Sequence, residues 1–114
     1  MVTPSIGSVV TVPFPFSDLS DSKLRPALVL AEAGRGDWIL CQMTSNAYSD
    51  SLAIRIEEED FVKGSLDRTS YARPGKLFTA SESLMVREVG ILKSEVLRQV
   101  SATVVRLLQA NVPL

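Results

Sequence analysis

Two polar side chains stand where apolar runs of the sequence begin or end. Arg25 comes directly before the run PALVLA, and Thr44 directly follows the run WILCQM. A guanidinium is planar, permanently charged and able to bind two phosphate oxygens at once, and a hydroxyl can donate a further hydrogen bond. We therefore predict that Arg25 and Thr44 converge on one phosphate group. A surface salt bridge for Arg25 and a simple turn contact for Thr44 are the alternative interpretations.

The composition limits which chemistry can accompany these two residues. The chain has no histidine, which excludes a Ser-His-Asp triad, histidine acid–base catalysis and histidine metal sites. Its single cysteine, Cys41, excludes an internal disulfide and a thiolate zinc cluster. Because Cys41 lies inside an apolar run, we expect a small buried side chain rather than a reactive thiol, in a reducing compartment. The predicted site has no cofactor and no metal.

Length and charge describe the kind of molecule that carries the site. With 114 residues and 46% hydrophobic content, we expect one domain spanning residues 1–114. The net charge of −1 gives no overall attraction to a polyanion, so such a ligand would need a local basic patch. Residues 61–81 supply a candidate, with Lys63, Arg68, Arg73 and Lys76 against Asp67 alone, a balance of +3.

No targeting or membrane segment is evident in the sequence. The opening residues, MVTPSIGSVV, lack a basic region followed by a sustained apolar stretch. No segment approaches the roughly 20 apolar residues of a membrane span. We expect a cytoplasmic protein without membrane contact.

The elements that must position Arg25 and Thr44 are short strands. Residues 8–12, 27–31, 38–44, 52–56 and 84–92 have strand patterns, the last with a bend at Gly90. Residues 34–37 (GRGD) predict a hairpin turn, and residues 57–60 (EEED) predict a solvated turn or short helical segment. Residues 13–26 are rich in proline, serine and aspartate and predict an exposed loop.

Two further segments complete the expected fold. Residues 63–79 are polar and basic, with Tyr71, Leu77 and Phe78 as possible anchors to the core. Residues 94–111 have helical periodicity, with Ser94 as the expected N-cap and an apolar stripe at Leu97, Val100, Val104, Leu107 and Leu108. Together the patterns predict a mainly β protein: a small, strongly bent sheet or barrel of five to six short strands with a C-terminal helix.

In their order, these segments resemble the PemK/MazF family, the endoribonuclease toxins of bacterial toxin–antitoxin pairs. The matching segments are Gly7-Ser8-Val9, Arg25-Pro26-Ala27-Leu28-Val29, Thr44-Ser45 and residues 70–100. The resemblance implies an SH3-like barrel with a C-terminal helix that forms a homodimer, with single-stranded RNA in the groove at the interface. It also implies metal-independent cleavage, by attack of the 2′-hydroxyl on the adjacent phosphorus, and a cognate antitoxin protein as partner.

The resemblance also implies roles for individual residues. Arg25, Thr44 and Arg73 correspond to catalytic positions: Arg25 stabilises charge, Thr44 hydrogen-bonds the scissile phosphate, and Arg73 is a second arginine for RNA binding or catalysis. Arg73 as a solvated loop charge, and Ser45 and Asn46 as turn-forming residues, are the alternatives. Aromatic candidates for base stacking are Phe14, Phe16, Tyr48 and Tyr71. Packing in the core or in a dimer interface is the alternative for the two phenylalanines. The predicted RNA-binding residues are Lys23, Ser45, Asn46, Tyr71 and Lys76.

Two departures from the family pattern concern the mechanism. Ser8 replaces an acidic residue of the opening motif, where we expect a structural role, and Gly75 stands where some members carry an acidic catalytic residue. Asp18 could supply a carboxylate instead if its loop closes over the substrate. Two rival functions remain: a gyrase poison of the same fold, which depends on the end of its C-terminal helix, and an inert member that only binds RNA or antitoxin.

Overall fold

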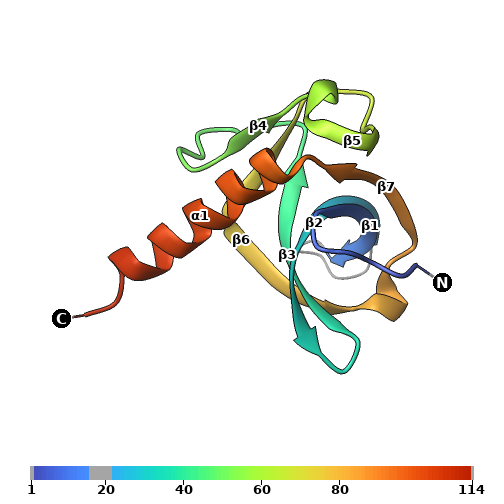
Figure 1. Cartoon of the computed structure of the whole chain (residues 1–114), viewed down its shortest axis with the longest axis horizontal. Coiled ribbons are helices and arrows are strands. Elements are labelled where there is room, and N and C mark those ends of the chain that lie inside the picture. Colours follow the sequence, from blue (N-terminus) through green and yellow to red (C-terminus); the bar gives the residue numbers. More distant parts are fainter. Residues whose placement is uncertain (1, 16–21, 114) are drawn as a thin grey trace.

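Seven β-strands form one antiparallel sheet that curls around a hydrophobic interior, and a single α-helix follows them (Figure 1). The structure is a computed structural model and describes residues 2–15 and 22–113. The order across the sheet is β4-β6-β3-β2-β1-β7-β5. The strands are β1 (Ser8–Pro15), β2 (Ser22–Gly34), β3 (Asp37–Thr44), β4 (Ile54–Ile56), β5 (Phe61–Gly64), β6 (Ser70–Ser81) and β7 (Arg87–Leu92).

The predicted mainly β fold with a C-terminal helix is confirmed, with more strands than the five to six expected. The turn predicted at residues 34–37 joins β2 to β3, where Arg35 and Gly36 both have positive φ angles, +56° and +80°. Two central residues of this kind match the twist of a tight hairpin. The acidic run contains a 3₁₀ turn, η1 (Glu58–Asp60), and a second such turn, η2 (Glu82–Leu84), precedes β7.

The loop predicted over residues 13–26 is wrong at both ends, because β1 continues to Pro15 and β2 starts at Ser22. Proline fits this ladder because its nitrogen, which carries no hydrogen, faces a side on which no strand pairs, so no ladder hydrogen bond is lost. The Thr11 carbonyl accepts a hydrogen bond from Val86, so Thr11 and Pro13 both turn their backbone groups toward β7, whose pairing stops at Thr11. Pro26 lies opposite Thr11 and faces β3, just beyond the last β2–β3 pair.

Strand β6 was not predicted at all, although it pairs with both β3 and β4. The alternation of buried and exposed residues along β6 is interrupted because residues 73–76 bulge out opposite Gln42. This irregularity lies between the pairs Cys41–Leu77 and Met43–Ala72. The expected anchors behave differently from one another. Phe78 packs on the core, whereas Leu77 is 38% exposed.

Two hydrophobic clusters line the two faces of the curled sheet. The first includes Val9, Leu28, Cys41, Met43 and Val100, and the second includes Val10, Val12, Ala27, Val29 and Leu40. The alternation of neighbouring residues between the clusters is the period-two pattern of strands buried on both faces. Cys41 is buried as predicted, and burial raises the pKa of its thiol to about 12.

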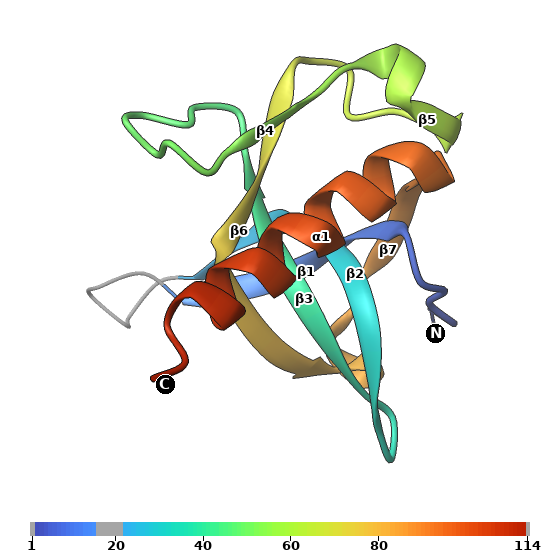
Figure 2. The ribbon, with the colours of Figure 1, turned by 60° about the vertical axis from the view of Figure 1, so that its left-hand side comes forward.

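Helix α1 (Ser94–Ala110) crosses β6, and its C-terminal end extends beyond the strands (Figures 1 and 2). Its N-cap is Lys93 rather than the predicted Ser94. Lys93 holds this position because its backbone N–H donates to the Asp60 carbonyl at 2.9 Å. Val100 is the fully buried residue of the stripe, whereas Leu108 is 59% exposed. Within the described part of the chain, no helix is long and apolar enough to cross a membrane.

Candidate functional site

A pocket opens where β2 starts and β3 ends, and both predicted phosphate contacts lie in its wall. Arg25 and Thr44 line it together with Ser45 and Arg68. The remaining lining residues are Leu24, Pro26, Met43, Leu66 and Ser70. The structure therefore gathers into one depression groups from β2, from β3 and from the segment between β5 and β6.

The register of the β2–β3 hairpin explains why Arg25 and Thr44 meet. The last pair of this ladder is Ala27 with Gln42. Arg25 stands two residues before Ala27, and Thr44 two residues after Gln42, so both lie at the same end of the hairpin. Side chains alternate between the two faces of a strand. A step of two residues therefore places Arg25 on the same face as Ala27 and Thr44 on the same face as Gln42. The hairpin turn at the far end thus fixes the approach of two residues that are distant in the sequence.

The hydroxyl of Thr44 is held by a local turn. Its Oγ1 donates to the Asn46 carbonyl at 3.1 Å and accepts from the Asn46 backbone N–H at 3.2 Å. A threonine hydroxyl carries one proton, so a bond to phosphate would replace the bond to the Asn46 carbonyl. Both bonds are solvent-exposed, which makes this exchange cheap. Ser45, next in the chain, is exposed at the pocket edge.

The charges in this pocket favour an anion. Arg25 is half-buried and Arg68 is exposed, and among the described lining residues none is acidic. Arg68 was not singled out as a site residue, because the sequence shows it only as one cation of the basic stretch. A turn brings it to the pocket: Asp67 has a φ of +62°, and its N–H donates to Ser65 Oγ at 2.9 Å. No signal in the local sequence distinguishes Arg68 from Lys63.

Arg73 lies outside this pocket. Its Nε donates to Asp50 Oδ2 at 2.8 Å, and its Nη1 donates to Gln42 Oε1 at 3.3 Å. The two side chains of the ion pair are only 21% and 15% exposed. The hydrogen bond from Arg73 lowers the pKa of Asp50, because it stabilises the ionised carboxylate. Arg73 is therefore not the solvated loop charge of the alternative interpretation: it holds the β3–β4 loop against β6.

A second pocket lies between the β3–β4 loop and β6. Its lining includes Tyr48, Asp50, Arg73, Gly75 and Lys76. The predicted site residues thus divide between two neighbouring depressions: Arg25, Thr44 and Ser45 in the first, Arg73 and Lys76 in the second. The β3–β4 loop contributes Ser45 to the first pocket and Tyr48 and Asp50 to the second, and Figure 2 shows this loop projecting from the ends of β3 and β4.

Three other predicted residues lie elsewhere. Lys23 is exposed on β2 opposite Phe14 and does not line the first pocket. Tyr71 is half-buried on β6, paired with Thr44, and Asn46 is exposed in the turn after Thr44. Phe16 and Asp18 fall outside the described residues.

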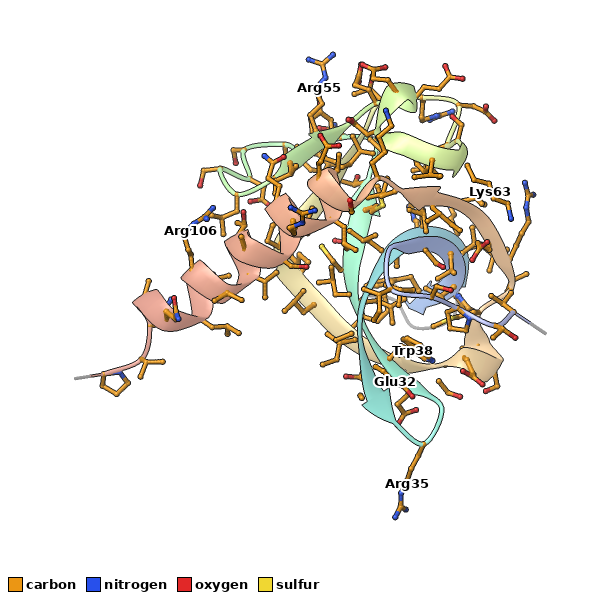
Figure 3. All side chains as sticks on the ribbon, viewed as in Figure 1. Glu32, Arg35, Trp38, Arg55, Lys63 and Arg106 are labelled. Atoms are coloured by element: carbon orange, nitrogen blue, oxygen red, sulfur yellow. The ribbon has the colours of Figure 1, made fainter. Side chains whose placement is uncertain are left out.

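The basic stretch 61–81 does not form one patch, contrary to the prediction. Lys63 lies 3.9 Å from the Glu88 carboxylate and points away from the hairpin (Figure 3). Arg73 is neutralised by Asp50, which leaves Arg68 in the first pocket and Lys76 in the second. The stretch divides because β5 and β6 are not neighbours in the sheet: β5 pairs with β7, β6 pairs with β3 and β4, and Arg68 lies in the connection between β5 and β6.

Two further side chains bear on the expectations. Ser8 is fully buried, and its hydroxyl donates to Glu88 Oε2 at 2.8 Å, a structural contact. Phe14 packs edge-on against Phe78 with ring centroids 5.0 Å apart, so its ring serves packing. Among residues 2–15 and 22–113, no group of three or more acidic or cysteine side chains is placed to hold a metal ion.

These observations define a small curled β-barrel with an arginine-lined pocket at the end of its central hairpin. Residues 5–108 match the family model described as the PemK-like, MazF-like toxin of type II toxin–antitoxin systems, and the chain belongs to this family. Comparison with curated protein sequences gives no match.

Solved structures share the fold at low sequence identity. MazF in the MazE–MazF complex of Deinococcus radiodurans is 21% identical, with a TM-score of 0.75 over 96% of this chain and 98% of that one. A mycobacterial endoribonuclease in complex with its cognate antitoxin is 13% identical, with a TM-score of 0.74 over 97% of this chain and 100% of that one. The Mycobacterium tuberculosis toxin MazF-mt6 is 15% identical, with a TM-score of 0.67 over 90% and 96%.

Proposed function

We propose that this toxin is a metal-independent endoribonuclease that cleaves single-stranded RNA at a phosphate bound in the first pocket. One observation carries the proposal: Arg25 and Thr44, which are distant in the sequence, share a pocket with Arg68. The mechanism requires no protein nucleophile, which suits a chain without histidine and with a buried, high-pKa cysteine.

The reaction is an internal transfer at phosphorus. The 2′-hydroxyl of one nucleotide loses its proton as its oxygen forms a bond to the adjacent phosphorus. The bond from that phosphorus to the 5′-oxygen of the next nucleotide breaks, and the departing 5′-oxygen takes up a proton, so no net proton is consumed. The products are a 2′,3′-cyclic phosphate and a 5′-hydroxyl end. The protein's task is to align the three atoms and to stabilise the negative charge that gathers on the phosphoryl oxygens.

Each pocket residue has a distinct part in this step. The Arg25 guanidinium binds the phosphoryl oxygens and strengthens its hold as charge develops. The Thr44 hydroxyl donates to one of these oxygens, and Arg68 binds an adjacent phosphate of the strand. A guanidinium is permanently charged in proteins, so Arg25 stabilises charge and does not accept the proton. Arg73 acts at one remove, by fixing the loop that follows Thr44.

The proposal extends to the protein's surroundings. The solved relatives include complexes of a toxin with its antitoxin, which supports a cognate antitoxin as partner of this chain. An acidic antitoxin segment that folds on binding would complement the two arginines of the first pocket. A homodimer, a cytoplasmic location and one domain over residues 1–114 belong to the same proposal.

The test is cleavage of a long single-stranded RNA by the purified protein in EDTA. We expect discrete fragments with 5′-hydroxyl ends. We expect Arg25→Ala to lower the rate by about 10²–10³-fold, the cost of removing a main charge-stabilising donor. Arg35→Ala is the matched control, because Arg35 lies exposed at the hairpin tip, at the opposite end of β3 from Thr44 (Figure 3).

Three results would contradict the proposal. Cleavage that survives in Arg25→Ala would place the chemistry elsewhere. Intact RNA together with trapped gyrase–DNA breaks would identify a gyrase poison. Intact RNA with tight antitoxin binding would identify an inert member of the family.

A further inference from the structure

We infer that the second pocket binds a nucleobase of single-stranded RNA, with the Tyr48 ring as its stacking surface. The pocket is lined by Tyr48, Ser49, Asp50, Leu52, Arg73 and Lys76, among others. The ligand class rests on the proposed function, because the strand that enters this pocket is the strand cleaved in the first. The subsite itself is argued from Tyr48, from the loop that carries it and from the charges beside it.

Tyr48 is in an unfavourable position for a structural residue. Its side chain is 81% exposed, and its φ angle is +54°. A bulky residue at positive φ is a backbone outlier, and such strain gathers at functional sites. An exposed aromatic ring also forgoes the free energy of burial. At this exposure the ring adds little to the core, so it is accessible to a ligand.

The Tyr48 backbone is nevertheless held firmly. Its N–H donates to Asn46 Oδ1 at 2.8 Å, and Asn46 is itself bonded to Thr44 Oγ1. Downstream, the Asp50 N–H donates to the Ala47 carbonyl at 3.0 Å, and the Asp50 carboxylate accepts from both Leu52 N–H and Arg73 Nε. The loop is thus tied at both sides of Tyr48. A ring presented on a fixed loop loses little entropy when a base stacks on it.

The neighbouring charges suit a nucleotide. Lys76 is exposed in the same pocket, where it can meet a backbone phosphate, while Arg73 is occupied by Asp50. Tyr48 follows Thr44 by four residues, so their Cα atoms are at most roughly 14 Å apart. One strand can therefore reach both pockets. Aromatic stacking with a nearby cation is the usual way in which proteins hold single-stranded nucleic acid.

The test measures binding rather than cleavage. A 2′-O-methyl RNA, which cannot be cleaved, is titrated against the wild-type protein, Tyr48→Ala and Tyr48→Phe. We expect Tyr48→Ala to weaken binding about tenfold and Tyr48→Phe to bind within about twofold of the wild type, because the phenyl ring keeps the stacking face. An abasic site is then moved along the RNA. At one position, removal of the base should weaken RNA binding by the wild type about tenfold and should not weaken binding by Tyr48→Ala any further.

The outcomes separate this inference from the proposed function. If Tyr48→Ala binds as tightly as the wild type while Arg25-dependent cleavage is intact, the subsite is refuted and the nuclease stands. The subsite is also refuted if the loss of affinity from Tyr48→Ala adds to the loss from base removal at every abasic position, since the ring would then stack on none of the bases. If Tyr48→Ala loses antitoxin binding but not RNA binding, the loop serves the antitoxin instead. If the wild type binds no RNA, both ideas fall.

Discussion

At the scale of single residues, the proposed nuclease site depends on Arg25 and Thr44, and the proposed base subsite depends on Tyr48. Arg25 and Thr44 meet at the open end of a hairpin, and Tyr48 presents an exposed ring from a strained position. Arg73 differs from them. Its guanidinium is committed to Asp50 and Gln42, so its contribution to any reaction passes through the geometry of the loop.

The Arg73–Asp50 pair predicts a pH-dependent stability. We expect Asp50→Asn to lower the free energy of unfolding at neutral pH by about 1–3 kcal/mol, since it breaks a largely buried pair. The pKa of Asp50 is lowered in the folded state by its hydrogen bond with Arg73. The stabilisation is therefore complete above the ordinary aspartate pKa of 3.8 and is lost as the pH falls through the lower, folded value.

Urea denaturation of the wild type and Asp50→Asn from pH 7 to pH 2.5 measures this effect. The difference between the two proteins should shrink as the pH drops. Glu59→Gln, at an exposed acidic residue of η1, is the control and should change stability by no more than about 0.5 kcal/mol. A difference that stays constant with pH would show that Asp50 contributes shape rather than charge.

At the scale of elements, irregularities in the strands place the site. In the bulge of residues 73–76 in β6, the Arg73 side chain bonds to Gln42 of the neighbouring strand β3, two residues before Thr44. A second register shift, between β1 and β7, falls at Val9 and Val10 beside Gly90. Sheet irregularities of this kind redirect side chains and tighten the curl of a sheet.

Gly90 offers a test of how closely β5 must approach β7. A Cβ at this position would lie 2.7 Å from the Lys63 carbonyl oxygen and 2.7 Å from Phe61 Cδ2. We expect Gly90→Ala to destabilise the protein by about 1–3 kcal/mol, because the backbone of β5 must move. Thermal denaturation measures the loss.

Gly75→Ala is the matched control for this substitution. Its nearest neighbour would be Leu52 Cδ1 at 3.8 Å, an ordinary contact, so stability should change by less than about 1 kcal/mol. If the two alanine variants have the same melting temperature, the close approach of β5 to β7 at Gly90 does not contribute measurably to stability.

At the scale of the whole molecule, the surface carries no single basic field. The net charge is −1, and Arg35, Arg55, Lys63 and Arg106 point outward from four different regions (Figure 3). If the proposed function is right, we expect RNA to be captured by the few cations at the two pockets rather than by long-range attraction. Affinity should fall with salt in proportion to the small number of phosphates contacted.

This distribution makes a prediction for Arg68. For single strands, each phosphate contact contributes about 0.7 to the slope of log affinity against log salt concentration. We expect Arg68→Ala to reduce that slope by about 0.7 and to weaken binding of the 2′-O-methyl RNA, measured by titration from 50 to 200 mM salt. Arg55→Ala should leave the slope unchanged, because Arg55 lies outside both pockets, 3.1 Å from Glu57. Equal slopes for wild type and Arg68→Ala would remove Arg68 from the phosphate path.

The sequence by itself determined the features that depend on neighbours in the chain. Local backbone preference and periodicity predicted the β-branched strands, the Arg35–Gly36 turn and the apolar stripe of the helix. They also predicted that Arg25, directly before Pro26, has an extended backbone. The loop prediction for the proline-containing ends of β1 and β2 is wrong because the structure of these ends depends on strands that are distant in the sequence. Their missing donors do no harm only because β7 and β3 stop pairing where the prolines begin.

Only the tertiary structure decided which distant groups share a surface. It divided the basic stretch between strands that are not neighbours in the sheet, placed Arg68 and Arg25 in one pocket, and tied Arg73 to Asp50. It also made a strand of β6, whose bulged sequence has no clear period of its own. The physical reason is that register, bulges and ion pairs depend on energies between strands far apart in sequence, which no local pattern contains.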